Sequence, residues 1–436
     1  MIPMYRNPAL FLMFALLSGC ATTEEMDGGE RPSVTLARHE SGGSMSGFGL
    51  VRTADHVKAV QLYPTADEEA LPFLSMGTGQ TLTLSFDIID EGTGSPLSVY
   101  FYHADKTWRR DLVPAEYLTS FLSDDIRNYE PSSSTELRYV HYTYEFPNTN
   151  IDFRVSGNYV VRVSEQGYED DPLFERAFFV SEDAAEIEFT FRSGLSPNGS
   201  LLQPIARVRP GSRLDGVQAF DFSACFARNG RFESANCTQD PSLLDLALYQ
   251  FELPRQASFP PEEPYYEINL GLLQINQQVL GVDLSTSPFR ANLDLDYARF
   301  GSEVDRGALT GQPVISDVYL DGGRAETQAE YVDVHFRFVP EGEQPLSRPV
   351  ILSGAFNNWQ TDRAYALDWN ASEGYYENTF LIKQGMYLYR YYTEDIAAAQ
   401  RRAVVNQPTI FTALIYVFDS TLHTDRLVSF RTALAR

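Results

Sequence analysis

The chain has 436 residues, of which 59 are acidic and 34 are lysine or arginine, and its formal net charge is −25 at pH 7. A surface this acidic repels phosphate backbones, so the composition argues against a nucleic-acid-binding protein. The length exceeds the roughly 250–300 residues of a single hydrophobic core, which predicts two to three domains.

The chain begins with an export signal. A short apolar run follows Arg6 and ends in the sequence LSGC at Cys20. The run is shorter than the roughly 20 residues of a membrane-spanning helix, so we expect residues 1–19 to be a cleavable lipoprotein signal peptide. Cleavage would leave Cys20 as a lipidated N-terminus. The alternative is an ordinary signal peptide with an incidental cysteine. Ala21 is not the aspartate that retains lipoproteins at the inner membrane, which favours the outer membrane.

Residues 20–50 are polar and rich in glycine and serine, which predicts a flexible tether. From 51 to 183 apolar and polar residues alternate with a period of two, as in half-buried strands. We expect strands at 81–88, 97–102, 139–146, 158–163 and 174–180, and a short helix at 115–122 after Pro114. Short strands at even spacing predict a β-sandwich for residues 51–183.

We expect a middle β domain over residues 184–325 and a last β-sandwich over residues 326–436. Strands of the last domain are predicted at 332–338, 349–354, 375–382, 386–392 and 412–419. No stretch combines a helical period with useful length. The chain is therefore predicted to be all-β, with two to three immunoglobulin-like β-sandwich domains after a flexible lipidated tether.

Three cysteines are present, and Cys20 is assigned to the lipid. Cys225 and Cys237 then form an even pair in an exported chain, which favours a disulfide. A metal site is the alternative, but the second pair of ligands that a closed site requires is missing.

The sequence contains no recognisable catalytic motif. The six histidines are scattered, without HExxH, GxSxG, Walker or GxGxxG patterns. His103 and Asp105 are two potential metal ligands, although the same residues are typical of a turn after a strand. Asp294 and Asp296 alternate as on the wet face of a strand, and a paired-carboxylate hydrolase is the alternative. We predict no catalytic residues, metal or cofactor, and no small-molecule substrate.

The last domain contains LSGAFNNW at 352–359 and GMYLYRY at 385–391. These blocks resemble the early-set immunoglobulin-like module of glycogen- and starch-binding proteins, in which exposed tryptophans stack on sugar rings. Trp359 and Trp369 are the candidate contacts to a sugar or a partner. The same pattern also marks the structural form of the module, in which the tryptophan caps the core. We expect Trp359 to be at least half buried in this way.

The N-terminal domain carries a longer series of blocks. In order, these are SVYFYHAD at 98–105 with Trp108, PAEYL at 114–118, IRNYEPS at 126–132, YVHY at 139–142, FPN at 146–148 and SGNY at 156–159. Together they resemble the type IX secretion system plug protein family over about residues 58–180. Looser matches occur at 229–235, in the two blocks of the last domain and at 426–428. The lipoprotein leader and the Cys225–Cys237 pair are not part of that pattern.

The resemblance implies a non-enzymatic stopper that closes the periplasmic side of the type IX translocon barrel while the barrel is unoccupied. The expected partners are that barrel and, through the lipid at Cys20, the membrane. The expected location is the periplasmic face of the outer membrane. The alternative is a surface or periplasmic carbohydrate-binding lipoprotein that uses Trp359 and Trp369.

Overall fold

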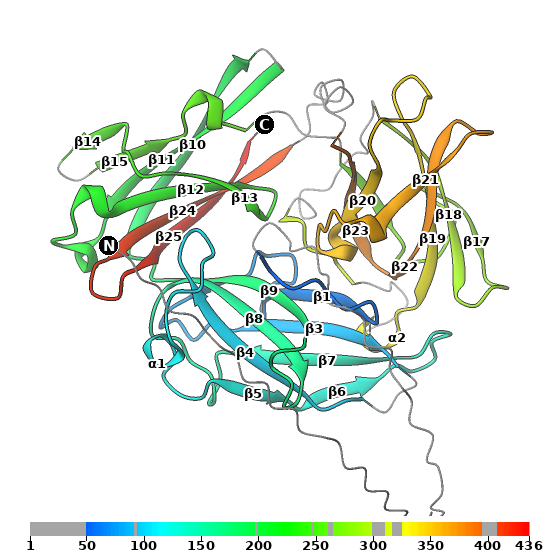
Figure 1. Cartoon of the computed structure of the whole chain (residues 1–436), viewed down its shortest axis with the longest axis horizontal. Coiled ribbons are helices and arrows are strands. Elements are labelled where there is room, and N and C mark those ends of the chain that lie inside the picture. Colours follow the sequence, from blue (N-terminus) through cyan, green and yellow to red (C-terminus); the bar gives the residue numbers. More distant parts are fainter. Residues whose placement is uncertain are drawn as a thin grey trace, which may run out of the picture. The chain divides into compact units, whose positions relative to one another are not determined.

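The computed structural model describes residues 49–90, 94–196, 199–245, 248–259, 265–298, 310–315, 325–394 and 408–435. Within these ranges the regular structure is almost entirely β-strand, with two four-residue α-helices and a few short 3₁₀ turns (Figure 1). The predicted all-β fold is therefore confirmed. The predicted signal peptide, Cys20 and most of the predicted tether lie outside the described residues.

The first sandwich pairs a four-stranded sheet with a five-stranded sheet, in the orders β1-β3-β7-β6 and β2-β9-β8-β4-β5. Its strands are β1 (Val57–Pro64), β2 (Phe73–Ser75), β3 (Leu82–Ile89), β4 (Leu97–Ala104), β5 (Ser123–Ile126), β6 (Asn128–Pro131), β7 (Tyr139–Phe146), β8 (Gly157–Glu165) and β9 (Pro172–Ser181). The strand predicted at 81–88 is present as β3, and its apolar residues Leu82, Leu84 and Phe86 are fully buried in the core between the sheets. The expected half-burial is wrong, because Thr83, Ser85 and Asp87 on the other face are buried as well.

The helix of this sandwich is shorter than expected. α1 spans only Pro114–Tyr117, and the prediction of a helix to residue 122 is wrong. Leu118 has extended backbone angles and forms a bridge with Phe153. The backbone after Tyr117 thus gains its hydrogen bonds from a neighbouring segment instead of from another helical turn.

The second sandwich contains two four-stranded sheets, in the orders β10-β11-β15-β14 and β13-β12-β24-β25. Its strands are β10 (Ala185–Ser196), β11 (Gly199–Pro210), β12 (Phe222–Arg228), β13 (Arg231–Thr238), β14 (Leu243–Asp245), β15 (Leu248–Glu252), β24 (Thr409–Asp419) and β25 (Thr424–Ala435). Its core contains buried aromatic residues from both sheets, among them Phe226, Phe251 and Phe411.

The third sandwich is an eight-stranded sheet with the order β16-β23-β20-β21-β22-β19-β18-β17, folded around its own core. Its elements are β16 (Tyr266–Asn269), β17 (Val279–Asp283), β18 (Phe289–Tyr297), α2 (Ala325–Gln328), β19 (Tyr331–Val339), β20 (Val350–Gly354), β21 (Ala366–Asn370), β22 (Tyr375–Lys383) and β23 (Met386–Tyr392). β18 and β19 run parallel, and the other pairings are antiparallel.

Strand pairing divides the chain differently from the ranges expected for the middle and last domains. β18 lies in the range 184–325 but pairs with β19, whereas β24 lies in the range 326–436 but pairs with β12. The third sandwich, residues 265–394, is thus inserted between β15 and β24 of the second. Alternating apolar residues predict that a strand exists, but not which strand it joins.

Cys225 and Cys237 lie opposite each other on β12 and β13. Their Cα atoms are 4.0 Å apart and the structure joins their sulfurs. The same strand register that pairs β12 with β13 therefore supports the predicted disulfide. Cys225 itself is buried between the second sandwich and the first.

The insertion predicts which segments fold alone. Residues 265–394, produced as a separate protein, should unfold cooperatively on heating, because they contain every strand of the third sandwich. Residues 326–436 should not, because β19 would lose β18 and β24 would lose β12. Circular dichroism during thermal unfolding of both segments distinguishes the cases. A cooperative transition for 326–436 alone would contradict the pairing.

Candidate functional site

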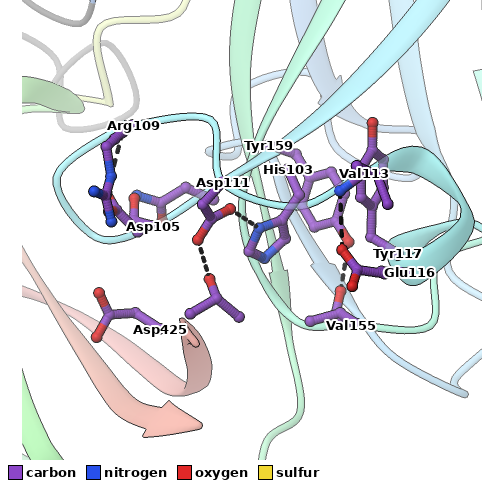
Figure 2. Close-up of polar contacts among 12 residues, drawn as sticks. His103, Asp105, Arg109, Asp111, Val113, Glu116, Tyr117, Val155, Tyr159 and Asp425 are labelled. Atoms are coloured by element: carbon purple, nitrogen blue, oxygen red, sulfur yellow. Dashed lines mark hydrogen bonds and ion pairs between the residues drawn. The ribbon is translucent and has the colours of Figure 1, made fainter. Parts of the chain in front are cut away.

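A polar joint connects the first and second sandwiches at the end of β4, and we call it the His103 joint. His103 Nδ1 lies 2.8 Å from Asp111 Oδ1, and Thr424, the first residue of β25, donates to the other oxygen of Asp111 (Figure 2). His103 Nε2 faces the carbonyl of Ser156 at 3.2 Å. His103 is 1% exposed, and its two ring nitrogens face the carboxylate of Asp111 and the carbonyl of Ser156.

Asp105 closes the turn that follows β4. Its Oδ1 accepts the backbone N–H groups of Thr107 at 2.9 Å and Arg109 at 3.1 Å, and its Oδ2 lies 3.1 Å from Arg109 Nε. These contacts match the turn reading of the residues from His103 to Asp105. Both carboxylate oxygens of Asp105 thus bind groups of the turn, and Figure 2 shows the contact with Arg109.

The SGNY block packs directly on the His103 ring. Gly157 has a φ of +152°, and a Cβ there would collide with His103. Asn158 donates to the carbonyl of Asp105 at 3.0 Å and accepts from the hydroxyl of Tyr416 in β24 at 2.7 Å. The ring of Tyr159 meets His103 edge-on at 5.1 Å. The blocks at 98–105 and 156–159 thus build one joint.

The order of groups in this joint is structural rather than catalytic. In a hydrolytic triad the histidine lies between the carboxylate and the hydroxyl. Here Asp111 lies between His103 and Thr424. Neither nitrogen of His103 faces a hydroxyl from which it could take a proton. Among the described residues, no group of three or more histidine, cysteine, aspartate or glutamate side chains could hold a metal ion.

Apolar rings complete the contact between these two sandwiches. Phe73 of β2 stacks on Phe179 of β9 at 4.6 Å and on Phe430 of β25 at 4.0 Å. Trp108 packs edge-on against Phe179 at 5.5 Å. Trp108 also packs against the apolar cluster that contains Cys225, Leu414 and Tyr416 of the second sandwich, so it contributes to the attachment of that sandwich.

A second buried polar cluster, the Asp87 joint, connects the first and third sandwiches. Asp87 of β3 accepts from Lys383 Nζ of β22 at 2.6 Å and from the hydroxyl of Tyr331 of β19 at 2.7 Å. Its other oxygen lies 2.7 Å from His141 Nδ1. Lys383 Nζ also lies 4.5 Å from the centre of the Tyr139 ring. Asp87 is fully buried and Lys383 nearly so.

Electrostatics keep the Asp87 carboxylate ionised. Burial alone would raise the pKa of the Asp87 carboxyl, but Lys383 and His141 outweigh it, so this pKa lies below its usual value. Burial also lowers the pKa of the Lys383 ammonium, and Asp87 opposes that effect. Asp87 and Lys383 carry no signal of their role in the sequence. Their alternation with apolar neighbours is also typical of solvated strand residues.

The two tryptophan candidates both pack on protein. Trp359 is partly buried, donates from Nε1 to the carbonyl of Gly311 at 2.9 Å, and meets Tyr265 edge-on at 5.7 Å. Trp369 is partly buried against Tyr376 at 5.0 Å. The structure does not bring the two rings together as an exposed platform. These contacts favour the structural reading of Trp359 and Trp369.

Asp294 and Asp296 do not share a wet face, so that prediction is wrong. Asp294 is exposed, whereas Asp296 is partly buried and accepts from the hydroxyls of Tyr389 at 2.8 Å and Tyr391 at 2.7 Å. The register of β18 against β19 shifts between Asn292 and Leu295, which breaks the alternation. Burial, opposed by the two tyrosine hydroxyls, raises the pKa of Asp296 to about 7.

These observations define a class of protein: a chain of β-sandwiches in which two buried polar clusters attach one sandwich to another. The comparison with known families identifies the first sandwich further. Residues 57–182 match the family model described as the type 9 secretion system plug protein first domain. The chain therefore carries the first domain of the type IX secretion system plug family, which confirms the resemblance and associates the chain with type IX secretion and the cell envelope.

The fold has a close counterpart among solved structures. It is similar to the crystal structure of a hypothetical protein from Parabacteroides merdae, with a TM-score of 0.78 and 20% identity over 88% of this chain and 99% of that chain. This identity supports a shared fold only. A biofilm-associated protein BSP domain has a TM-score of 0.17 and 9% identity over 88% of this chain and 60% of that chain, which is too low to indicate a shared fold. No curated protein matches the chain significantly. Within the described residues, no helix has the length and apolarity to cross a membrane.

The Asp87 joint predicts a large asymmetry between single and double substitutions. Lys383→Met should lower the free energy of unfolding by about 3–5 kcal/mol, because it leaves a buried carboxylate without its cation. Asp87→Asn combined with Lys383→Met should recover part of that loss. Arg207→Met, which breaks the exposed pair with Glu188, should cost less than about 1 kcal/mol. Denaturant unfolding measures all three variants, and equal effects of Lys383→Met and Arg207→Met would contradict the joint.

Trp359 should act as a core cap. Trp359→Ala should cost about 3 kcal/mol of stability, the lower end for a large core aromatic because the ring is only partly buried. Phe418→Ala, at an exposed ring, should change stability by less than about 0.5 kcal/mol. Thermal unfolding and retention on insoluble polysaccharides distinguish a structural role of Trp359 from a role in sugar binding. An unchanged melting temperature with lost retention would support sugar binding instead.

Proposed function

We propose that this protein is a non-enzymatic outer-membrane lipoprotein that closes the periplasmic side of the type IX translocon barrel while the barrel is unoccupied. The match of residues 57–182 to the plug-protein first domain is the observation that carries the proposal. A wide barrel leaks small molecules unless a folded body blocks it. Such a body has to resist deformation, and the buried joints supply that resistance.

Two further features support a docking role. The matched domain exposes the aromatic rings of Phe121, Tyr129 and Tyr168, a residue type that protein interfaces favour. Lipid attachment at Cys20 would keep the chain at the membrane that holds the barrel and raise its effective concentration there. The lipid would do so without adding any contact at the barrel mouth.

Deleting the gene should make the outer membrane permeable to vancomycin or a large dye while secretion continues, because the unoccupied pore stays open. Removing the barrel as well should restore the barrier. Returning the Cys20→Ala variant should close the pore only partly at native expression, since the anchor supplies concentration rather than contacts. Dye entry is compared across these strains, with barrel production confirmed by immunoblot. Equal permeability of wild type and single deletion would count against the plug.

A further inference from the structure

A polar cleft of about 610 Å³ lies on the first sandwich beside α2 of the third. Its walls come from β1, β3, β6, β7, the segment after β6 and α2. The lining residues are Tyr63, Thr65, Thr83, Asn128, Tyr129, Glu130, Ser133, His141, Thr143, Glu145, Glu326, Thr327 and Gln328. The volume lies within the range of about 300–1,000 Å³ that is typical of ligand sites.

The floor of the cleft is rigid because it belongs to a central strand. Tyr142 and Tyr144 of β7 face the core, so His141 and Thr143 face the cleft. Asp87 holds His141 from below, and Thr143 Oγ1 lies 3.2 Å from His141 Nε2. A bound group would therefore meet fixed side chains at the floor.

The charge of the cleft has one sign. Glu130, Glu145 and Glu326 line it, no lysine or arginine does, and none of the three forms an ion pair with a described residue. The buried cation Lys383 is paired with Asp87 beneath the floor and interacts electrostatically with Glu326, without forming an ion pair with it.

Tyr63 reports the same negative surroundings. Burial raises the pKa of its hydroxyl to about 12, and the carboxylates of Glu68, Glu326 and Glu145 contribute to the increase. The hydroxyl thus stays protonated, and the ring of Tyr63 lines the cleft together with that of Tyr129. Both rings are suited to cation–π contacts with an ammonium or guanidinium group.

We propose that this cleft receives a lysine or arginine side chain from a segment of a partner protein. Charge-assisted hydrogen bonds to the three glutamates and contact with the tyrosine rings would hold the cationic group. The inference deepens the proposed function, on which it rests for its partner: the plug would dock through a basic segment of the barrel assembly. A neutral sugar would leave three carboxylates without a counter-charge, so it fits less well.

A lysine peptide tests the inference on the full-length mature protein, kept in detergent because of the lipid expected at Cys20. The probe is a capped heptapeptide with two lysines, and its counterpart has glutamine at both positions. Nuclear magnetic resonance titration of the peptide measures affinity at low and at physiological salt. The lysine peptide should bind at least tenfold more tightly than the glutamine peptide, and salt should weaken its binding.

Matched variants separate the cleft from the overall acidity of the chain. Glu130→Gln, Glu145→Gln and Glu326→Gln combined should weaken binding at least tenfold. Glu186→Gln, Glu343→Gln and Glu373→Gln combined remove the same charge from exposed positions outside the cleft and should change affinity less than twofold. Circular dichroism confirms that both triple variants are folded.

Two outcomes would overturn the inference. Equal weakening in both triple variants would mean non-specific attraction to an acidic surface. A maltooligosaccharide that binds at the cleft and excludes the peptide would make the cleft a sugar site. The dye-entry experiment on the deletion strain tests the plug separately. If either of these results is found while the deletion strain still leaks dye, the proposed role of the cleft is refuted but the proposed plug function is not.

Discussion

The buried pair of Asp87 and Lys383 is the interaction on which the arrangement of the sandwiches depends most. Asp87 belongs to the first sandwich and Lys383 to the third, and both side chains are buried. Separating the two sandwiches would leave at least one charge facing apolar protein before water could reach it. A buried pair contributes little net stability compared with a well-packed apolar contact, but a broken pair is costly. The pair therefore acts mainly by favouring one arrangement of the first sandwich relative to the third.

The His103 joint performs the same task by different means. It contains hydrogen bonds, an edge-on ring contact and a glycine that permits close approach. Two of the blocks through which the chain resembles the plug family, at 98–105 and 156–159, supply most of these residues. Other blocks lie elsewhere: those at 126–132 and 139–142 contain Tyr129, Glu130 and His141, which line the cleft.

Sequence patterns predicted local structure better than long-range structure. The alternation in β3 and β7 placed those strands correctly because each strand buries its apolar side chains in one core. The same patterns did not show that β24 returns to β12 after an inserted sandwich, because pairing is a property of two distant segments. Asp296 was misplaced because a bulge, which has no reliable sequence signal, changes the face that a residue occupies.

The candidate site shows a similar division. The turn at Asp105 was predictable, since aspartate accepting from residues two and four positions later is a local arrangement. Asp87, His141 and Lys383 were not, because the charge on one strand has meaning only when its partner on another sandwich is known. From the sequence alone, a single aspartate in an alternating strand is predicted to be solvated, because the sequence does not show that another sheet covers it.

The position of the cleft also depends on how the third sandwich covers the first. The outer face of β3 and β7 would be an ordinary wet sheet surface if the first sandwich stood alone. α2 and its neighbours cover one part of that face, where Asp87 and Lys383 pair, and leave the adjoining part open, where Glu145 and His141 line the cleft. His141 belongs to both parts, since one ring nitrogen faces Asp87 and the other faces Thr143. A cation bound over His141 would therefore act on the charge balance of the joint directly below it, and docking at the cleft would be coupled to the rigidity that a plug requires.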